Sequence, residues 1–209
     1  GYQAYQNTST FQLADQMGTY YLYVQFRDTA SKTSAIAYSA IDYAPPNILQ
    51  GIINKDLTLG LNQSPYSVVS DLIINSGVTL TVEPGVEVKF NGKYGITVNG
   101  SLLAEGQSDQ RITFTQSDGS NNWKGIDFSG GSSQSRIRYC DFSRSTWMTS
   151  GGFLNGGSSL KEVSHCTFSQ IQSEGAMVTI VVVEAADAKI EDNHFTTSGS
   201  TNTISSRGG

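Results

Sequence analysis

The chain is poor in charge, proline, cysteine and histidine, and these shortages exclude several classes of protein. Charged residues make up only 15% of its 209 residues, and 13 lysines and arginines face 18 aspartates and glutamates, for a formal net charge of −5. Nucleic acids and anionic membranes require clustered basic residues, so neither is an expected partner. Two cysteines cannot form a disulfide framework, so a hydrophobic core must hold the fold together.

Long apolar runs are also missing. The longest, at 177–183, is far too short to span a bilayer, so we expect no membrane insertion. No apolar stripe has the 3.6-residue period of an amphipathic helix. Instead, the 22 glycines and many Ser, Thr and Asn residues separate short apolar stretches, which is typical of an all-β protein. The chain starts at Gly1 without a signal peptide, and we expect it to be a piece of a longer polypeptide.

A short motif at 136–142 returns at 160–168 and again at 188–195. Aligned on their phenylalanines, the three copies are 26 and 27 residues apart, a spacing typical of repeat proteins. Short strands that recur without a crossover helix predict a parallel solenoid, in which coils stack about 4.8 Å apart and each inward side chain covers its own copy. We therefore expect an aliphatic stack, an aromatic stack and a small corner column: Ile137, Val163, Ile190; Phe142, Phe168, Phe195; Cys140, Cys166, Asn193.

The same alignment makes further predictions about neighbours. Asp141 should lie beside Thr167 and His194, and Glu162 beside Arg136 and Lys189. A second apolar track with similar spacing should run through Ile126, Phe153, residues 177–180 and Ile204.

Several stretches carry a family resemblance. They are Gly-Val-Thr-Leu-Thr-Val-Glu-Pro-Gly-Val at 77–86, Gly-Ser-Leu-Leu-Ala-Glu-Gly at 100–106, Ile-Thr-Phe-Thr at 112–115 and Trp-x-Gly-Ile-x-Phe at 123–128. With them, residues 64–209 resemble a right-handed parallel β-helix of large secreted and surface bacterial proteins, truncated at the C-terminus. The resemblance implies a secreted or cell-surface location, but that family includes lyases, hydrolases, adhesins and stalks, so it implies no single activity.

The N-terminal part has a different pattern. Strands are expected at 10–13, 19–27 and 34–43, and residues 19–27 alternate as in a half-buried strand. Residues 1–44 resemble the last half of a bacterial immunoglobulin-like domain, which implies a partial β-sandwich. The paired prolines Pro45 and Pro46 mark the boundary, and 45–63 are expected to be a linker and N-terminal cap.

The two cysteines occupy one column, one coil apart. Their Cα atoms should lie about 5 Å from each other, within the range for an inter-coil disulfide. Cys140 and Cys166 also fit a pair of small buried side chains, and a metal site is a third alternative. His165 is adjacent to Cys166, but His194 lies in another column and no zinc-type spacing of four ligands exists, so we expect no metal site.

Aromatic side chains provide the candidate ligand site. Rings exposed along a β-helix can stack on sugar rings, which makes Trp123, Trp147 and Tyr94 candidates for carbohydrate binding. For Trp123 the alternative is that the indole folds over the coil beneath it.

Catalytic patterns are not found. The acidic residues read as scattered surface charge and not as a converging carboxylate cluster, and two histidines support no Ser-His-Asp or Cys-His arrangement. We therefore expect no catalytic residues and no cofactor, with Ca²⁺ as the one ion that this fold family leaves open. The favoured interpretation is a non-catalytic structural or adhesive module that binds other subunits by end-to-end strand stacking, or binds polysaccharide. The alternative is a lyase or hydrolase acting on acidic polysaccharide.

Overall fold

The computed structural model describes residues 4, 10, 18–43, 47–117, 123–128, 134–147, 153–156, 159–173, 178–183, 187–196 and 202–206. The chain divides into two compact units, Gly1–Pro46 and Asn47–Gly209. No helix within the described ranges is long and apolar enough to cross a membrane.

The described residues of the N-terminal unit form one antiparallel hairpin. Strand β1 (Gly18–Val24) pairs with β2 (Ala37–Tyr43) along its whole length. The turn between them is organised by Asp28, whose carboxylate accepts backbone N–H groups from Ala30 and Lys32. The hairpin matches two of the predicted strands, whereas 11–13 of the first predicted strand lie outside the described residues. One hairpin does not establish an immunoglobulin-like sandwich, which stays a prediction.

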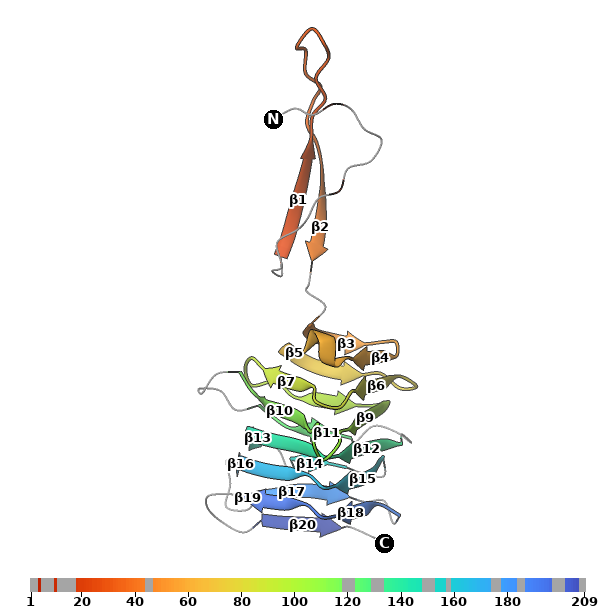
Figure 1. The fold of residues 1–209 in the computed structure, drawn as a ribbon, viewed down its shortest axis with the longest axis vertical. Coiled ribbons are helices and arrows are strands. Elements are labelled where there is room, and N and C mark those ends of the chain that lie inside the picture. The colour runs from red at the N-terminus through yellow and green to blue at the C-terminus, as the bar shows by residue number, and fades with distance from the viewer. Residues whose placement is uncertain are drawn as a thin grey trace. The chain divides into compact units, whose positions relative to one another are not determined.

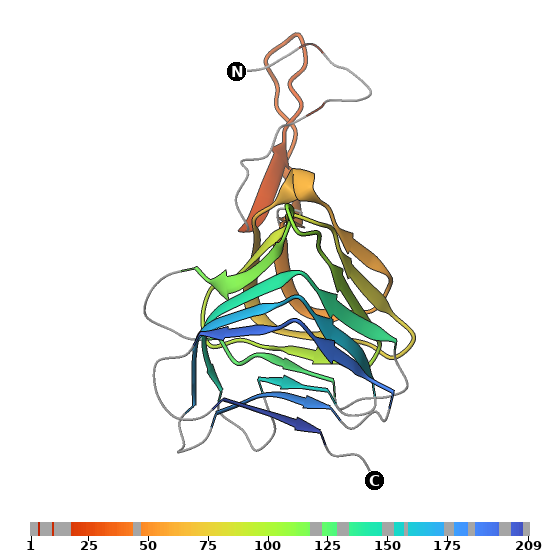
Figure 2. The ribbon, with the colours of Figure 1, turned by 60° about the horizontal axis from the view of Figure 1, so that its bottom comes forward.

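The second unit is a parallel β-solenoid with three faces (Figures 1 and 2). Face one is a six-stranded sheet, and faces two and three belong to one twelve-stranded sheet joined through the long strand β5. Face one contains β4 (Leu57–Leu59), β6 (Thr79–Val82), β9 (Ser101–Glu105), β12 (Ser135–Arg138), β15 (Leu160–Ser164) and β18 (Lys189–Glu191). Face two contains the start of β5 (Tyr66–Ile74), β7 (Glu87–Phe90), β10 (Ile112–Gln116), β13 (Cys140–Trp147), β16 (Thr167–Ser173) and β19 (His194–Thr196). Face three contains the end of β5, β8 (Ile96–Val98), β11 (Ile126–Asp127), β14 (Leu154–Asn155), β17 (Val178–Val183) and β20 (Asn202–Ser206).

The interior is built from stacked copies of the same side chain. Phe114, Phe142, Phe168 and Phe195 lie one above the other, with ring centroids 5.1, 5.1 and 5.0 Å apart and planes within 11° of parallel. Strands such as β6 and β10 alternate buried and half-buried residues, as expected where one side faces a core. This register confirms the predicted aromatic stack.

The other predicted columns behave as follows. Val163 pairs with Ile137 on one side and Ile190 on the other, so the aliphatic stack is confirmed. The neighbours predicted for Asp141 and Glu162 are also confirmed.

The second apolar track was placed wrongly by one residue. Ile126 pairs with Leu154, which continues to Val181 and Ile204. Phe153 precedes this column, and its carbonyl accepts the N–H of Ile126 at 2.9 Å. Because Phe153 and Leu154 are both buried, alternation alone could not show which of them opens the strand.

The solenoid also begins earlier than residue 64. Strand β3 (Ile48–Ile53) pairs with β5, and β4 pairs with β6, so the segment predicted as linker and cap contains two strands that already lie in the solenoid sheets. The apolar pattern is weak there because a register shift between Leu49 and Gly51 interrupts the alternation, and because Ile52 is apolar but 60% exposed, in an outward column with Ile73.

Candidate functional site

The chain turns from face one to face two at a single residue with left-handed backbone geometry. Tyr139, His165 and Asp192 occupy this position in three successive coils, with φ of 49°, 54° and 51°. The following residue of each coil, Cys140, Cys166 or Asn193, belongs to the inner column. We call Tyr139, His165 and Asp192 the corner ladder.

Side chains of the corner ladder contact one another between coils. The rings of Tyr139 and His165 are parallel within 7°, with centroids 4.5 Å apart. Below them, His165 Nδ1 lies 3.7 Å from Asp192 Oδ2. The backbone is held as well, because the N–H of His165 donates to the carbonyl of Glu191 at 3.1 Å. The imidazole is partly exposed and the Asp192 carboxylate mostly so.

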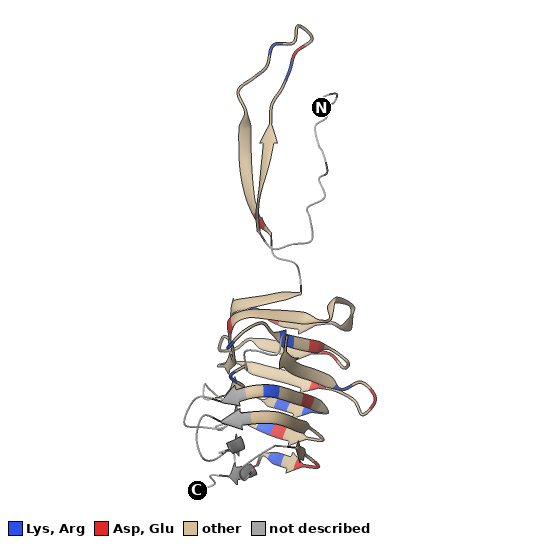
Figure 3. Ribbon diagram, turned by 90° about the vertical axis from the view of Figure 1, so that its left-hand side faces the viewer, with Lys and Arg blue, Asp and Glu red and all other residues tan. Residues whose placement is uncertain are grey.

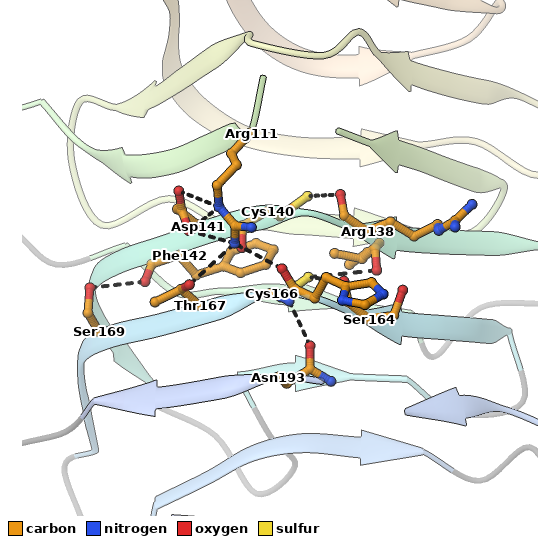
Figure 4. Close-up of polar contacts among 12 residues, drawn as sticks. Arg111, Arg138, Cys140, Asp141, Phe142, Ser164, Cys166, Thr167, Ser169 and Asn193 are labelled. Carbon is orange, nitrogen blue, oxygen red and sulfur yellow. Dashed lines mark hydrogen bonds and ion pairs between the residues drawn. The ribbon is translucent and has the colours of Figure 1, made fainter. Parts of the chain in front are cut away.

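Arg111 clamps three coils beside this ladder. Its Nε donates to both oxygens of Asp141, at 2.9 and 3.0 Å, and its Nη2 donates to the carbonyls of His165 and Cys140 and to Thr167 Oγ1. Figure 4 shows the guanidinium between Asp141 and Thr167. The hydrogen bond to Asp141 raises the pKa of Arg111, so the clamp is always charged.

Both cysteines are buried free thiols. The Cys140 thiol donates to the carbonyls of Ala104 and Arg138 at 3.4 and 3.3 Å, and the Cys166 thiol donates to that of Ser164 at 3.2 Å. Burial raises the pKa of Cys140, so that this thiol stays protonated. Hence no disulfide joins the coils in this structure, and the pair occupies the column as small buried side chains.

Asn193 takes the place of a cysteine in the next coil. Its Oδ1 accepts the N–H of Cys166 at 2.9 Å, and its Nδ2 donates to the carbonyl of Val163 at 2.8 Å. The amide thus satisfies backbone groups that a thiol would leave weakly bonded.

The three aromatic candidates have different surroundings. Trp123 is fully buried, stacks on Phe90 at 4.1 Å and donates its indole N–H to the carbonyl of Ser143. A buried ring offers no face to a sugar, so Trp123 has the alternative role of packing within the coils. Tyr94 is partly buried against the core. The side chain of Trp147 lies outside what the structure describes.

Lysines, arginines, aspartates and glutamates recur along the solenoid (Figure 3), and several of them form ion pairs between coils. Arg138 Nη1 lies 3.8 Å from Oε1 of Glu105 in the preceding coil, and Arg138 Nε lies 3.2 Å from Oε1 of Glu162 in the following one. Lys124 contacts Asp71, and Lys161 contacts Asp187. These carboxylates are spread along the solenoid, and each is paired with a lysine or arginine side chain. They form a series of surface ion pairs.

One group of potential metal ligands occurs among the described residues. The ligating atoms of His165, Glu191 and Asp192 all lie within 4.8 Å of one another. Sequence reasoning missed this group because it compared His165 with His194 and the cysteines. The signal was present in the alignment on phenylalanine, whose column three residues earlier reads Tyr139, His165, Asp192.

The protein is therefore a parallel β-solenoid with a stacked, apolar interior and a polar corner on its outer surface. Part of the chain is 32% identical over 96 residues to Protein bark beetle of Drosophila melanogaster, a match that covers 46% of this chain. The aligned stretch is only 3% of the length of that protein, so the similarity does not establish a family. No family model matches the chain, and no solved structure matches it.

Proposed function

We propose that the chain is a non-catalytic structural or adhesive module of a large extracellular or cell-surface protein. In this proposal the solenoid is a right-handed parallel β-helix that forms a stiff rod, and the N-terminal hairpin belongs to an immunoglobulin-like domain. The observation that supports the proposal best is the pairing of outer charges between successive coils.

Such pairing suits a rod better than an enzyme. A sheet whose register slips by one residue turns its buried side chains outward, so any contact that depends on register favours the native stack. Each exposed ion pair stabilises a protein by only about 0–1 kcal/mol, but a series such as Glu105, Arg138 and Glu162 penalises every slipped arrangement. Catalysis of polysaccharide cleavage would instead place acid and base groups around one substrate bond.

The size of the similar fly protein agrees with a modular role. A stretch that fills nearly half of this chain but 3% of that protein would be one module among many. Solenoids lend themselves to this use because each coil contacts only its neighbours and length is added coil by coil.

Polysaccharide turnover provides the decisive test. The protein is incubated with uronate polymers and neutral glycans, with and without Ca²⁺, and new chain ends and unsaturated products are measured. We expect no turnover. Turnover that disappears when one acidic residue is changed to its amide would refute the proposal and establish the lyase or hydrolase alternative. A glycan array run in parallel separates binding without cleavage from a purely structural role.

Assembly is tested separately. Among the described residues, strand β4 is the last of its sheet, and such an edge is a template for pairing with another subunit. We expect light scattering to show concentration-dependent oligomers. A strictly monomeric protein with intact β-type circular dichroism would contradict end-to-end stacking.

A further inference from the structure

We propose that His165, Glu191 and Asp192 form a zinc-binding site on the outer corner of the solenoid. The site would tie two successive coils together, because His165 follows β15 and the two carboxylates lie at the end of β18 and just after it. The proposal goes beyond a structural or adhesive role and does not depend on it.

Distances between the ligating atoms are close to those of a bound ion. A tetrahedral zinc with bonds of about 2.0–2.1 Å holds its ligand atoms about 3.4 Å apart. Nδ1 of His165 and Oδ2 of Asp192 are already 3.7 Å apart, and the third ligand lies within 4.8 Å of both. Small side-chain rotations would therefore bring the three atoms to bonding distance, with water as the fourth ligand.

The types of donor atom select the metal. Calcium prefers six to eight oxygen ligands, and an imidazole nitrogen in a set of three is unsuited to it. One imidazole and two carboxylates match the nitrogen and oxygen donors of zinc sites that keep one open position. The buried thiols of Cys140 and Cys166 are bonded to backbone carbonyls and contribute nothing to the site.

Two contacts hold the imidazole in place before a metal binds. The Tyr139 ring covers one face of it at 4.5 Å, which restricts its rotation. Arg111 Nη2 donates to the His165 carbonyl at 2.9 Å and fixes the backbone at the corner. An imidazole that is already restricted in this way loses less conformational freedom when a metal binds.

Lys189 opposes binding. Its ammonium is paired with the Glu191 carboxylate two residues along the same strand. Zinc must displace this cation or share the carboxylate with it. Removing the ammonium should therefore strengthen zinc binding, which gives a test that does not depend on damaging the site.

The experiment is a titration of the whole chain with Zn²⁺ by calorimetry and with Co²⁺ by visible absorption. The variants are His165→Asn and Asp192→Asn, since asparagine tolerates left-handed backbone geometry and should leave the corner folded. His194→Asn is the matched control, because His194 is the other histidine of the sequence and lies outside the cluster. Circular dichroism verifies the fold of each variant.

We expect saturable binding of one zinc per chain and a tetrahedral Co²⁺ spectrum. Affinity should fall more than about tenfold in His165→Asn and Asp192→Asn, stay unchanged in His194→Asn, and rise in Lys189→Met. Absence of saturable binding at millimolar metal would overturn the proposal. An equal loss of affinity in His194→Asn, or no gain in Lys189→Met, would overturn the assignment of these ligands.

Discussion

Truncation of Phe142 to alanine tests the stacked interior directly. Phe142 is fully buried, with Phe114 and Phe168 stacked on its two faces at 5.1 Å each. Phe153 meets its edge, with centroids 5.6 Å apart. The substitution would remove a whole ring from a column whose members cannot collapse into the gap, because each is held by its own coil.

The expected cost follows from those contacts. Removal of a buried phenylalanine side chain costs about 3–5 kcal/mol. Aromatic pairs add about 0.5–1.5 kcal/mol each beyond area burial, and two stacked neighbours place Phe142→Ala at about 4–5 kcal/mol. Phe195 is half-buried and is stacked on Phe168 alone among the described rings, so Phe195→Ala should cost roughly 2 kcal/mol. For a unit of this size, the larger loss would lower Tm by about 8–20 °C.

Urea unfolding followed by circular dichroism measures both variants, and Phe26→Ala provides the control. Phe26 is 57% exposed in the N-terminal unit, and its truncation should change the free energy of unfolding by no more than about 0.5 kcal/mol. If Phe195→Ala destabilises the protein as much as Phe142→Ala, the energy does not depend on having neighbours on both sides. That result would refute the stacking argument.

Three further changes test other parts of the structure. Arg111→Lys should lower the free energy of unfolding by about 1–2 kcal/mol in thermal melts, because the single nitrogen of an ammonium cannot reproduce the planar fork in which Nε reaches Asp141 and Nη2 reaches two carbonyls. A melt identical to wild type would contradict the clamp. Gly100→Ala would place a methyl 2.1 and 2.3 Å from two backbone oxygens and should lower the free energy of unfolding by about 3 kcal/mol or more. In the control Gly18→Ala, the methyl meets nothing within 4 Å and stability should not change. Equal melting temperatures for the two variants would contradict the packing around Gly100. Cys140 and Cys166 should be inert to a thiol reagent in the native protein, because both thiols are buried. Both should react once the protein is unfolded without reductant. If the unfolded protein has no reactive thiol, the two cysteines are oxidised.

The stacked columns could be predicted from sequence because they repeat a physical requirement. Each coil must bury the same inward positions, so Phe142, Phe168 and Phe195 align without any knowledge of the structure. The first coil could not be recognised in this way, since a register shift between Leu49 and Gly51 and the outward-facing Ile52 interrupt the apolar alternation of β3.

The left-handed corner was beyond prediction for a different reason. Positive φ is usually signalled by glycine or asparagine, but Tyr139 and His165 adopt it here. Their strained geometry persists because surrounding contacts determine it: a buried cysteine follows each residue, and backbone N–H groups bond to the next coil. The left-handed geometry therefore depends on tertiary packing, and the residue types at these positions do not indicate it.

The left-handed corner brings polar side chains closer together than a flat face of the solenoid would. The outward residue of each coil lies over its copy at about the coil spacing of 4.8 Å, slightly wider than the separation of two ligands on one metal ion. At this corner the side chains close that gap between coils, since Nδ1 of His165 and Oδ2 of Asp192 are 3.7 Å apart, and Glu191 adds a third ligand from the same coil as Asp192. The coil below is the less buried of the two, with Ile190 and Phe195 only half-buried. A cross-link at this corner would therefore stabilise the less firmly packed of these two coils.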